Sequence, residues 1–192
     1  LGNTSLNPET IDTLELAFDY QFTNNIRTGL NLFHYHMNDI IRFLPDPSPA
    51  TTSSAKNAGS QKGYGLEWEI NWSISNTLKI NANYALQRSQ DQTTHTDAGN
   101  APHNEIYGGL NWLFERNWSF DPQVTWVGER QRVFDDPRSP LKGYTLVDVT
   151  LRRTNIKDNF EVAASVRNLF DDDAREPSPS PGQIPNDIPL DG

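Results

Sequence analysis

The strongest constraint in this sequence is a strict alternation of bulky apolar and polar or small residues, clearest in GYGLEWEINWSI (residues 63–74). Successive side chains of a β-strand point to opposite faces, so this stretch is predicted to be a strand with one apolar and one polar face. The stretch alone leaves open which face is inside. The apolar row could pack in the core of a soluble sandwich or face the lipid around a membrane barrel. The apolar row is Tyr64, Leu66, Trp68, Ile70, Trp72 and Ile74.

The same alternation recurs along the chain, and helical periodicity is hard to find. It predicts an all-β protein with about eight strands. Residues 27–43 alternate less regularly than the others, so a bulge or phase slip is expected near Phe33. The predicted strands cover residues 14–22, 27–43, 63–74, 78–87, 106–114, 118–127, 145–153 and 160–170.

The connections between these strands alternate strictly between short and long. Antiparallel strands joined in this way form an up-and-down meander, with all short turns at one end and all long loops at the other. That arrangement is typical of outer-membrane barrels, whereas a Greek-key sandwich has no reason to sort its connections. The predicted fold is therefore an antiparallel up-and-down transmembrane β-barrel. The short turns are 23–26, 75–77, 115–117 and 155–159, and the long loops are 45–62, 89–104, 128–143 and 171–192.

The barrel prediction assigns each row of side chains an environment. Tyrosine and tryptophan are stable at headgroup depth, because the ring is apolar and its polar atom can reach water. Aromatic residues near both strand ends are predicted to form two membrane girdles, namely Tyr64, Trp72, Trp112, Trp118 and Trp126. The opposite row is predicted to face a wet lumen, and its marked members are Glu67, Glu69, Asn71, Asn81 and Asn83.

Composition agrees with strands that are apolar on one face only. Just 35% of the residues are hydrophobic, yet the chain carries 5 Trp, 6 Tyr and 9 Phe. The formal net charge of −9 argues against a polyanionic partner such as DNA. No apolar run approaches the roughly 18 residues that a transmembrane helix needs. The absence of cysteine excludes disulfides, cysteine-ligated zinc and thiol catalysis.

No pattern in the sequence indicates an enzyme. There is no GxSxG motif, no phosphate-binding loop and no Cys/His cluster. Glu67 and Glu69 share a strand face and could suggest an acid/base pair, but in a barrel they are solvated wall residues. His34 and His36 are two residues apart and lack a third ligand. The sequence therefore predicts no catalytic residue, no metal site and no cofactor.

The long loops carry the candidate ligand-binding residues. Arg130, Arg132 and Arg138 lie in one predicted outer loop close to Trp126. Arginine together with aromatic rings is suited to holding anionic chelates through charge and stacking. His95, in another outer loop, could touch haem or a ferric chelate. The alternative, that these four side chains are simply solvated loop residues, remains open.

Several segments in a fixed order resemble the C-terminal barrel region of TonB-dependent outer-membrane receptors, of the ferric-siderophore receptor type. GNTSLNPETIDTLELAF (2–18) is similar to the entry into a barrel strand. NAGSQKGYGLEWEINW (57–72) resembles the hairpin segment G-x-E-x-E of the family. Three further segments match: APHN (101–104), GYTLVDVTLR (143–152) and VRNLFDDDAREP (166–177).

The resemblance implies that residues 1–192 are a C-terminal portion of a larger barrel of about 22 strands, with the plug domain and the final strand outside this chain. It implies a Gram-negative outer-membrane receptor that binds an iron–siderophore-like ligand and imports it with energy supplied by TonB. The expected partners are the ligand, outer-membrane lipid and, through the plug, the TonB complex. The alternatives are a passive outer-membrane porin and a soluble β-sandwich that binds partners.

Overall fold

The computed structural model describes residues 3–46, 52–157, 159–178 and 184–190. These residues form one eight-stranded antiparallel sheet and a separate two-stranded ribbon made by β9 (Arg175–Glu176) and β10 (Ile188–Pro189). The sheet strands are β1 (Thr10–Thr23), β2 (Ile26–Pro45), β3 (Ser53–Ser73), β4 (Leu78–Asp91), β5 (Asn104–Glu115), β6 (Trp118–Val127), β7 (Tyr144–Ile156) and β8 (Phe160–Val166). The described part of the chain contains no helix, and so none that is long and apolar enough to cross a membrane.

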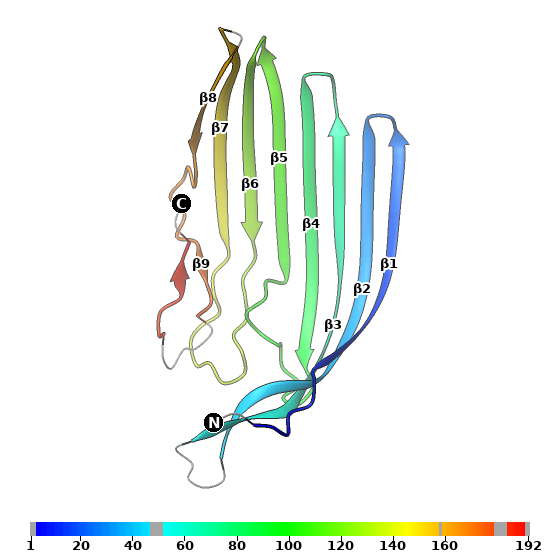
Figure 1. Ribbon diagram of the computed structural model, residues 1–192, viewed down its shortest axis with the longest axis vertical. Coiled ribbons are helices and arrows are strands. Elements are labelled where there is room, and N and C mark those ends of the chain that lie inside the picture. Colours follow the sequence, from blue (N-terminus) through cyan, green and yellow to red (C-terminus); the bar gives the residue numbers. More distant parts are fainter. Residues whose placement is uncertain (1–2, 47–51, 158, 179–183, 191–192) are drawn as a thin grey trace.

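The sheet is a simple meander, since its strand order follows the chain from β1 to β8. Figure 1 shows the four short turns together at one end of the sheet and the long connections at the other. The prediction of an all-β, antiparallel, up-and-down fold is confirmed. In the described residues the sheet is open, because β1 pairs only with β2 and β8 only with β7.

The strand register continues each face of β3 onto its neighbours. Leu66 pairs with Leu32 on β2 and with Leu86 on β4, so three leucines lie side by side on the apolar face. Glu67, one residue later, pairs with Asn31 and belongs to the opposite, polar face. The alternation seen in single strands is thus a property of the whole sheet.

No described residue covers the apolar face of the sheet. Large apolar side chains along it are widely exposed, for example Leu14 at 76% and Phe18 at 53%. Among the described residues, the buried hydrophobic side chains are few: Val127, Leu141, Tyr144 and Ala174, at the long-loop end of β6 and β7. Burial of apolar area stabilises a soluble domain, and here that area is left on one face of the sheet. This distribution fits a barrel wall and does not fit a soluble sandwich.

Two local predictions for β2 and β3 were wrong. The expected loop 45–62 is largely strand, since β2 continues to Pro45 and β3 begins at Ser53; residues 47–51 lie outside the described part. The expected irregularity near Phe33 lies instead between Met37 and Ile41. There Asp39 has a φ of 56°, a left-handed conformation that aspartate tolerates better than most residues. Beyond this point the hairpin of β2 and β3 bends away from the sheet (Figure 1).

On the polar face, bulky side chains lie over glycines of the adjacent strand. A Cβ atom at Gly65 would lie 2.3 Å from the Leu86 carbonyl oxygen and 2.5 Å from the Phe33 ring. A Cβ atom at Gly63 would meet the Tyr35 ring at 2.6 Å. These glycines are needed for close approach, because any side chain would occupy space already filled by a ring or by backbone.

Candidate ligand-binding surfaces

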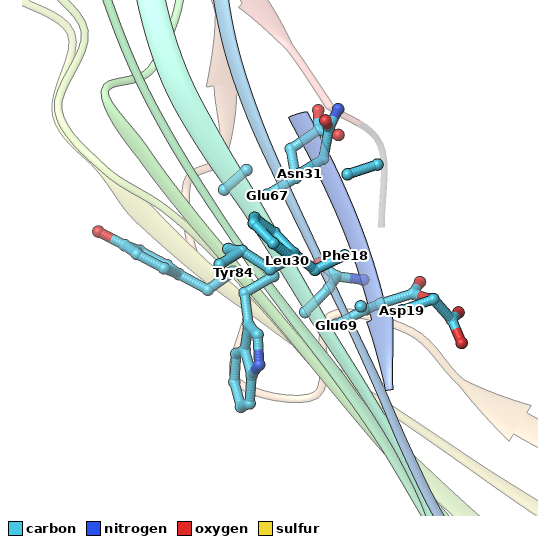
Figure 2. A pocket seen from close by; sticks show the side chains of 12 residues that line it. Phe18, Asp19, Leu30, Asn31, Glu67, Glu69 and Tyr84 are labelled. Carbon is cyan, nitrogen blue, oxygen red and sulfur yellow. The ribbon is translucent and has the colours of Figure 1, made fainter. Parts of the chain in front are cut away.

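The polar face of β3 and β4 carries the residues predicted to line a lumen. Glu69 pairs with Asn83, and Asn71 pairs with Asn81, so these amides and carboxylates lie in adjacent rows. Figure 2 shows Glu67 and Glu69 projecting to one side of the sheet and Tyr84 to the other. The register therefore brings the five predicted wall residues together on one face. That this face borders a lumen remains a prediction.

The charge on this face is mostly negative near β1 to β3. Asp19 and Glu69 lie on it beside Arg27, whose guanidinium group donates to both Asp19 carboxylate oxygens at 2.6–3.2 Å. Both side chains of this ion pair are more than half exposed, so water screens the pair and it adds little to stability. The surface remains open to polar or basic groups that approach it.

The predicted girdle residues all belong to the apolar face. Trp72 pairs with Ile26 and Ile80 near the short turns, and Tyr64, at the other end of β3, is 58% exposed. Rings cluster beside the turn after β5, where the Phe114 and Trp118 centroids are 6.4 Å apart. The remaining girdle residues follow the same face, with Trp112 opposite Phe120 and Trp126 opposite Ile106. Their depth in a membrane remains a prediction.

The three candidate arginines of the loop 128–143 are all engaged with carboxylates. Arg130 is 2% exposed, donates to Glu176 at 2.6 Å and to the Arg175 carbonyl oxygen, and lies 5.5 Å from the centroid of the Tyr144 ring. Its packing and partners give it a structural role, since it joins the loop to β9. It is not available to a ligand in this conformation.

Arg132 and Arg138 converge on one aspartate. Arg132 donates from both terminal nitrogens to the two carboxylate oxygens of Asp187, each at 2.7 Å. Arg138 donates to Asp187 at 3.2 Å and also binds both carboxylate oxygens of Asp136. These contacts join the loop to residues 184–190, which follow it by more than forty positions.

Electrostatics show how strongly these groups interact. Hydrogen bonds from Arg132 lower the pKa of Asp187 to about 2, and those from Arg138 lower the pKa of Asp136 to about 2. The same hydrogen bonds raise the pKa values of both arginines. The cluster therefore stays fully ionised at any physiological pH.

His95, the fourth candidate, lies in the connection between β4 and β5, beside Thr96, which lines a cavity together with Arg132 and Arg138. It is exposed in a tight turn with a φ of 58°, and its amide donates to the Asp91 carbonyl oxygen at 2.9 Å. Nearby, Arg42 forms an ion pair with Asp91, and His103 Nε2 lies 2.5 Å from Asp97 Oδ2. Within the described residues, no group of three or more His, Asp or Glu side chains is arranged to hold a metal ion.

Sequence reasoning missed Asp187, Glu176 and Asp136, the acidic partners of the arginines. Asp136 is only two residues from Arg138, a spacing that could have been noticed. Asp187 and Glu176 are 55 and 46 residues from their partners, and nothing in the sequence pattern predicts those pairings.

Comparison with known proteins decides the family. A family model described as TonB dependent receptor-like, beta-barrel, matches residues 1–169. The chain belongs to this family of TonB-dependent receptors. The family and the structural neighbours are transport receptors and not enzymes, which confirms that expectation from the sequence.

The relatives are much longer than this chain. It is 24% identical over 178 residues to the vitamin B12 transporter BtuB of Vibrio cholerae, covering 88% of this chain and 27% of that protein. The ferric enterobactin receptor PfeA of Pseudomonas aeruginosa, solved with enterobactin, has a TM-score of 0.75 at 22% identity, covering 91% of this chain and 27% of that one. The iron transporter FrpB of Neisseria meningitidis has a TM-score of 0.72 at 16% identity, and the match covers 91% of this chain and 29% of FrpB.

Proposed function

We propose that this chain is the C-terminal part of the barrel wall, residues 1–192, of an outer-membrane receptor. The receptor binds a ferric siderophore or similar scarce nutrient outside the cell. It imports this ligand with energy that the TonB complex supplies through a plug domain. Binding and gated passage, without covalent chemistry, make up the mechanism.

The observation that carries this proposal is the two-faced sheet. The described residues leave its apolar face uncovered, its polar face is continuous across the strands, and its long connections gather at one end. Such a sheet is stable when lipid covers the apolar side and water or protein fills the polar side. Membership of the receptor family supports an outer-membrane location.

The names of similar proteins support the ligand class. Two structural neighbours are described as an iron transporter and a ferric enterobactin receptor, and the matching curated protein as a vitamin B12 transporter. Two of these three names refer to iron. An iron chelate is therefore the ligand we propose.

Uptake of radiolabelled ferric chelates by cells that express the complete receptor tests the proposal. We expect saturable uptake that is lost when TonB is deleted or when a protonophore collapses the proton gradient. Cells without the receptor gene provide the baseline. Uptake that persists without TonB would instead support a passive porin, and recovery of the protein in the soluble periplasmic fraction would contradict the membrane assignment.

A further inference from the structure

The acidic partner of Arg132 and Arg138 comes from a distant part of the chain. The Asp187 carboxylate accepts hydrogen bonds from both terminal nitrogens of Arg132 and from one terminal nitrogen of Arg138. It also accepts one from the backbone amide of Ser178. Its side chain is only 15% exposed. A paired, fork-like contact of this kind is the geometry in which a guanidinium group binds any planar carboxylate.

The same two arginines also line a cavity of about 310 Å³ among the long loops. Gln131 and Thr96 add polar groups to its wall, and Phe134, 71% exposed, adds a ring face. Two acidic residues line it as well. Asp136 is held by Arg138, and Asp97 contacts His103, so both already have partners.

We propose that Asp187 is an internal substitute for an oxyanion of the ligand. In the absence of ligand its carboxylate occupies the guanidinium groups of Arg132 and Arg138 at the edge of this cavity. A ligand carboxylate, or an oxyanion of similar shape, replaces Asp187 on the arginines. This inference rests on the proposed receptor function and specifies it, because it requires an anionic ligand.

Replacement of Asp187 also changes the conformation of the outer surface. Residues 184–190 are tied to the loop through Asp187 and through the Pro185 carbonyl oxygen, which accepts from Arg138 at 3.2 Å. When an oxyanion takes these arginines, both ties are lost and residues 184–187 separate from them, while β10 stays paired with β9, which Arg130 holds to the loop. Binding of the anion and release of residues 184–187 are therefore coupled, since each state excludes the contacts of the other.

The test measures binding of two simple anions, citrate and inorganic phosphate, to the purified complete receptor by calorimetry. In the variant Asp187→Asn the competing charge is removed, and we expect citrate affinity to rise by about tenfold or more. A rise in affinity for citrate alone identifies a carboxylate ligand. A rise in affinity for both citrate and phosphate identifies oxyanions in general. The matched control is Asp173→Asn, because Asp173 pairs with Arg175 outside this cluster and is 73% exposed. Its citrate affinity should be unchanged.

Two results would overturn the inference. One is an unchanged or reduced citrate affinity in Asp187→Asn. The other is obtained without any substitution: if saturating citrate leaves hydrogen exchange in residues 184–187 of the unaltered receptor unchanged, no coupling exists. The rise in citrate affinity caused by Asp187→Asn should also disappear in the double variant Asp187→Asn, Arg132→Gln. TonB-dependent uptake is measured separately, so failure here leaves the proposed transport function intact.

Discussion

The two faces of β3 make a sharp prediction for adjacent residues. Leu66 lies on the apolar face between Leu32 and Leu86, and Glu67 lies on the polar face. Counting from Trp72 near the short turn, Leu66 is six residues along the strand. At about 3.3 Å per residue and about 45° tilt, it lies about 14 Å from Trp72 and about 5 Å from Tyr64, within an apolar band about 25 Å tall but nearer its outer edge.

An arginine costs about 2–4 kcal/mol at the middle of the band in barrels of this kind, and less toward either interface. For Leu66→Arg we therefore expect the free energy of unfolding to fall by about 1–3 kcal/mol. Glu67→Arg, on the wet face, should change it by less than about 1 kcal/mol. The assay is urea unfolding of the complete receptor in lipid vesicles, followed by tryptophan fluorescence. Equal costs for the two variants, or a larger cost for Glu67→Arg, would refute the assignment of faces.

Two further predictions concern packing and pH. Gly65→Ala should destabilise the receptor by about 1–3 kcal/mol, because the new methyl group meets backbone at 2.3 Å. The control Gly108→Ala meets only a methyl group of Val124 at 3.3 Å and should stay within about 1 kcal/mol in the same urea assay; similar costs would contradict the close approach at Gly65. The Asp187 pKa falls from 3.8 to about 2 in the folded state, so its stabilisation is complete above pH 3.8 and is lost as pH falls toward 2. Hydrogen exchange of residues 184–187, corrected for its intrinsic pH dependence, should show the contact intact at pH 5 and open near pH 2, and opening at pH 5 would contradict this reasoning.

Strand positions within the segments of alternating side chains were predictable because two independent signals coincide there. Alternation gave the face of each side chain, and the sorted connections gave the direction of each strand. The prediction for β6 matches residue for residue, from Trp118 to Val127. The last predicted strand was too long, since β8 ends at Val166 and Asn168 and Asp171 adopt positive φ values.

Outside the segments of alternating side chains, the sequence carries less information. Residues 53–62 are polar and lack the apolar rows that reveal a strand, yet they pair with β2 through backbone hydrogen bonds that do not depend on side-chain type. The contacts of Arg132 and Arg138 could not be foreseen for a different reason. They depend on how two loops pack together, and sequence periodicity does not encode that.

The irregularity at Asp39 has a consequence for how such a receptor can change over evolution. It divides β2 into a part fixed by its place in the wall and an outer part that follows its own direction with β3. Paired insertions or deletions beyond Asp39 would lengthen or shorten the outer hairpin while every partner from Ile26 to Met37 keeps its place. This break in the register thus lets the outer hairpin diversify without rebuilding the barrel.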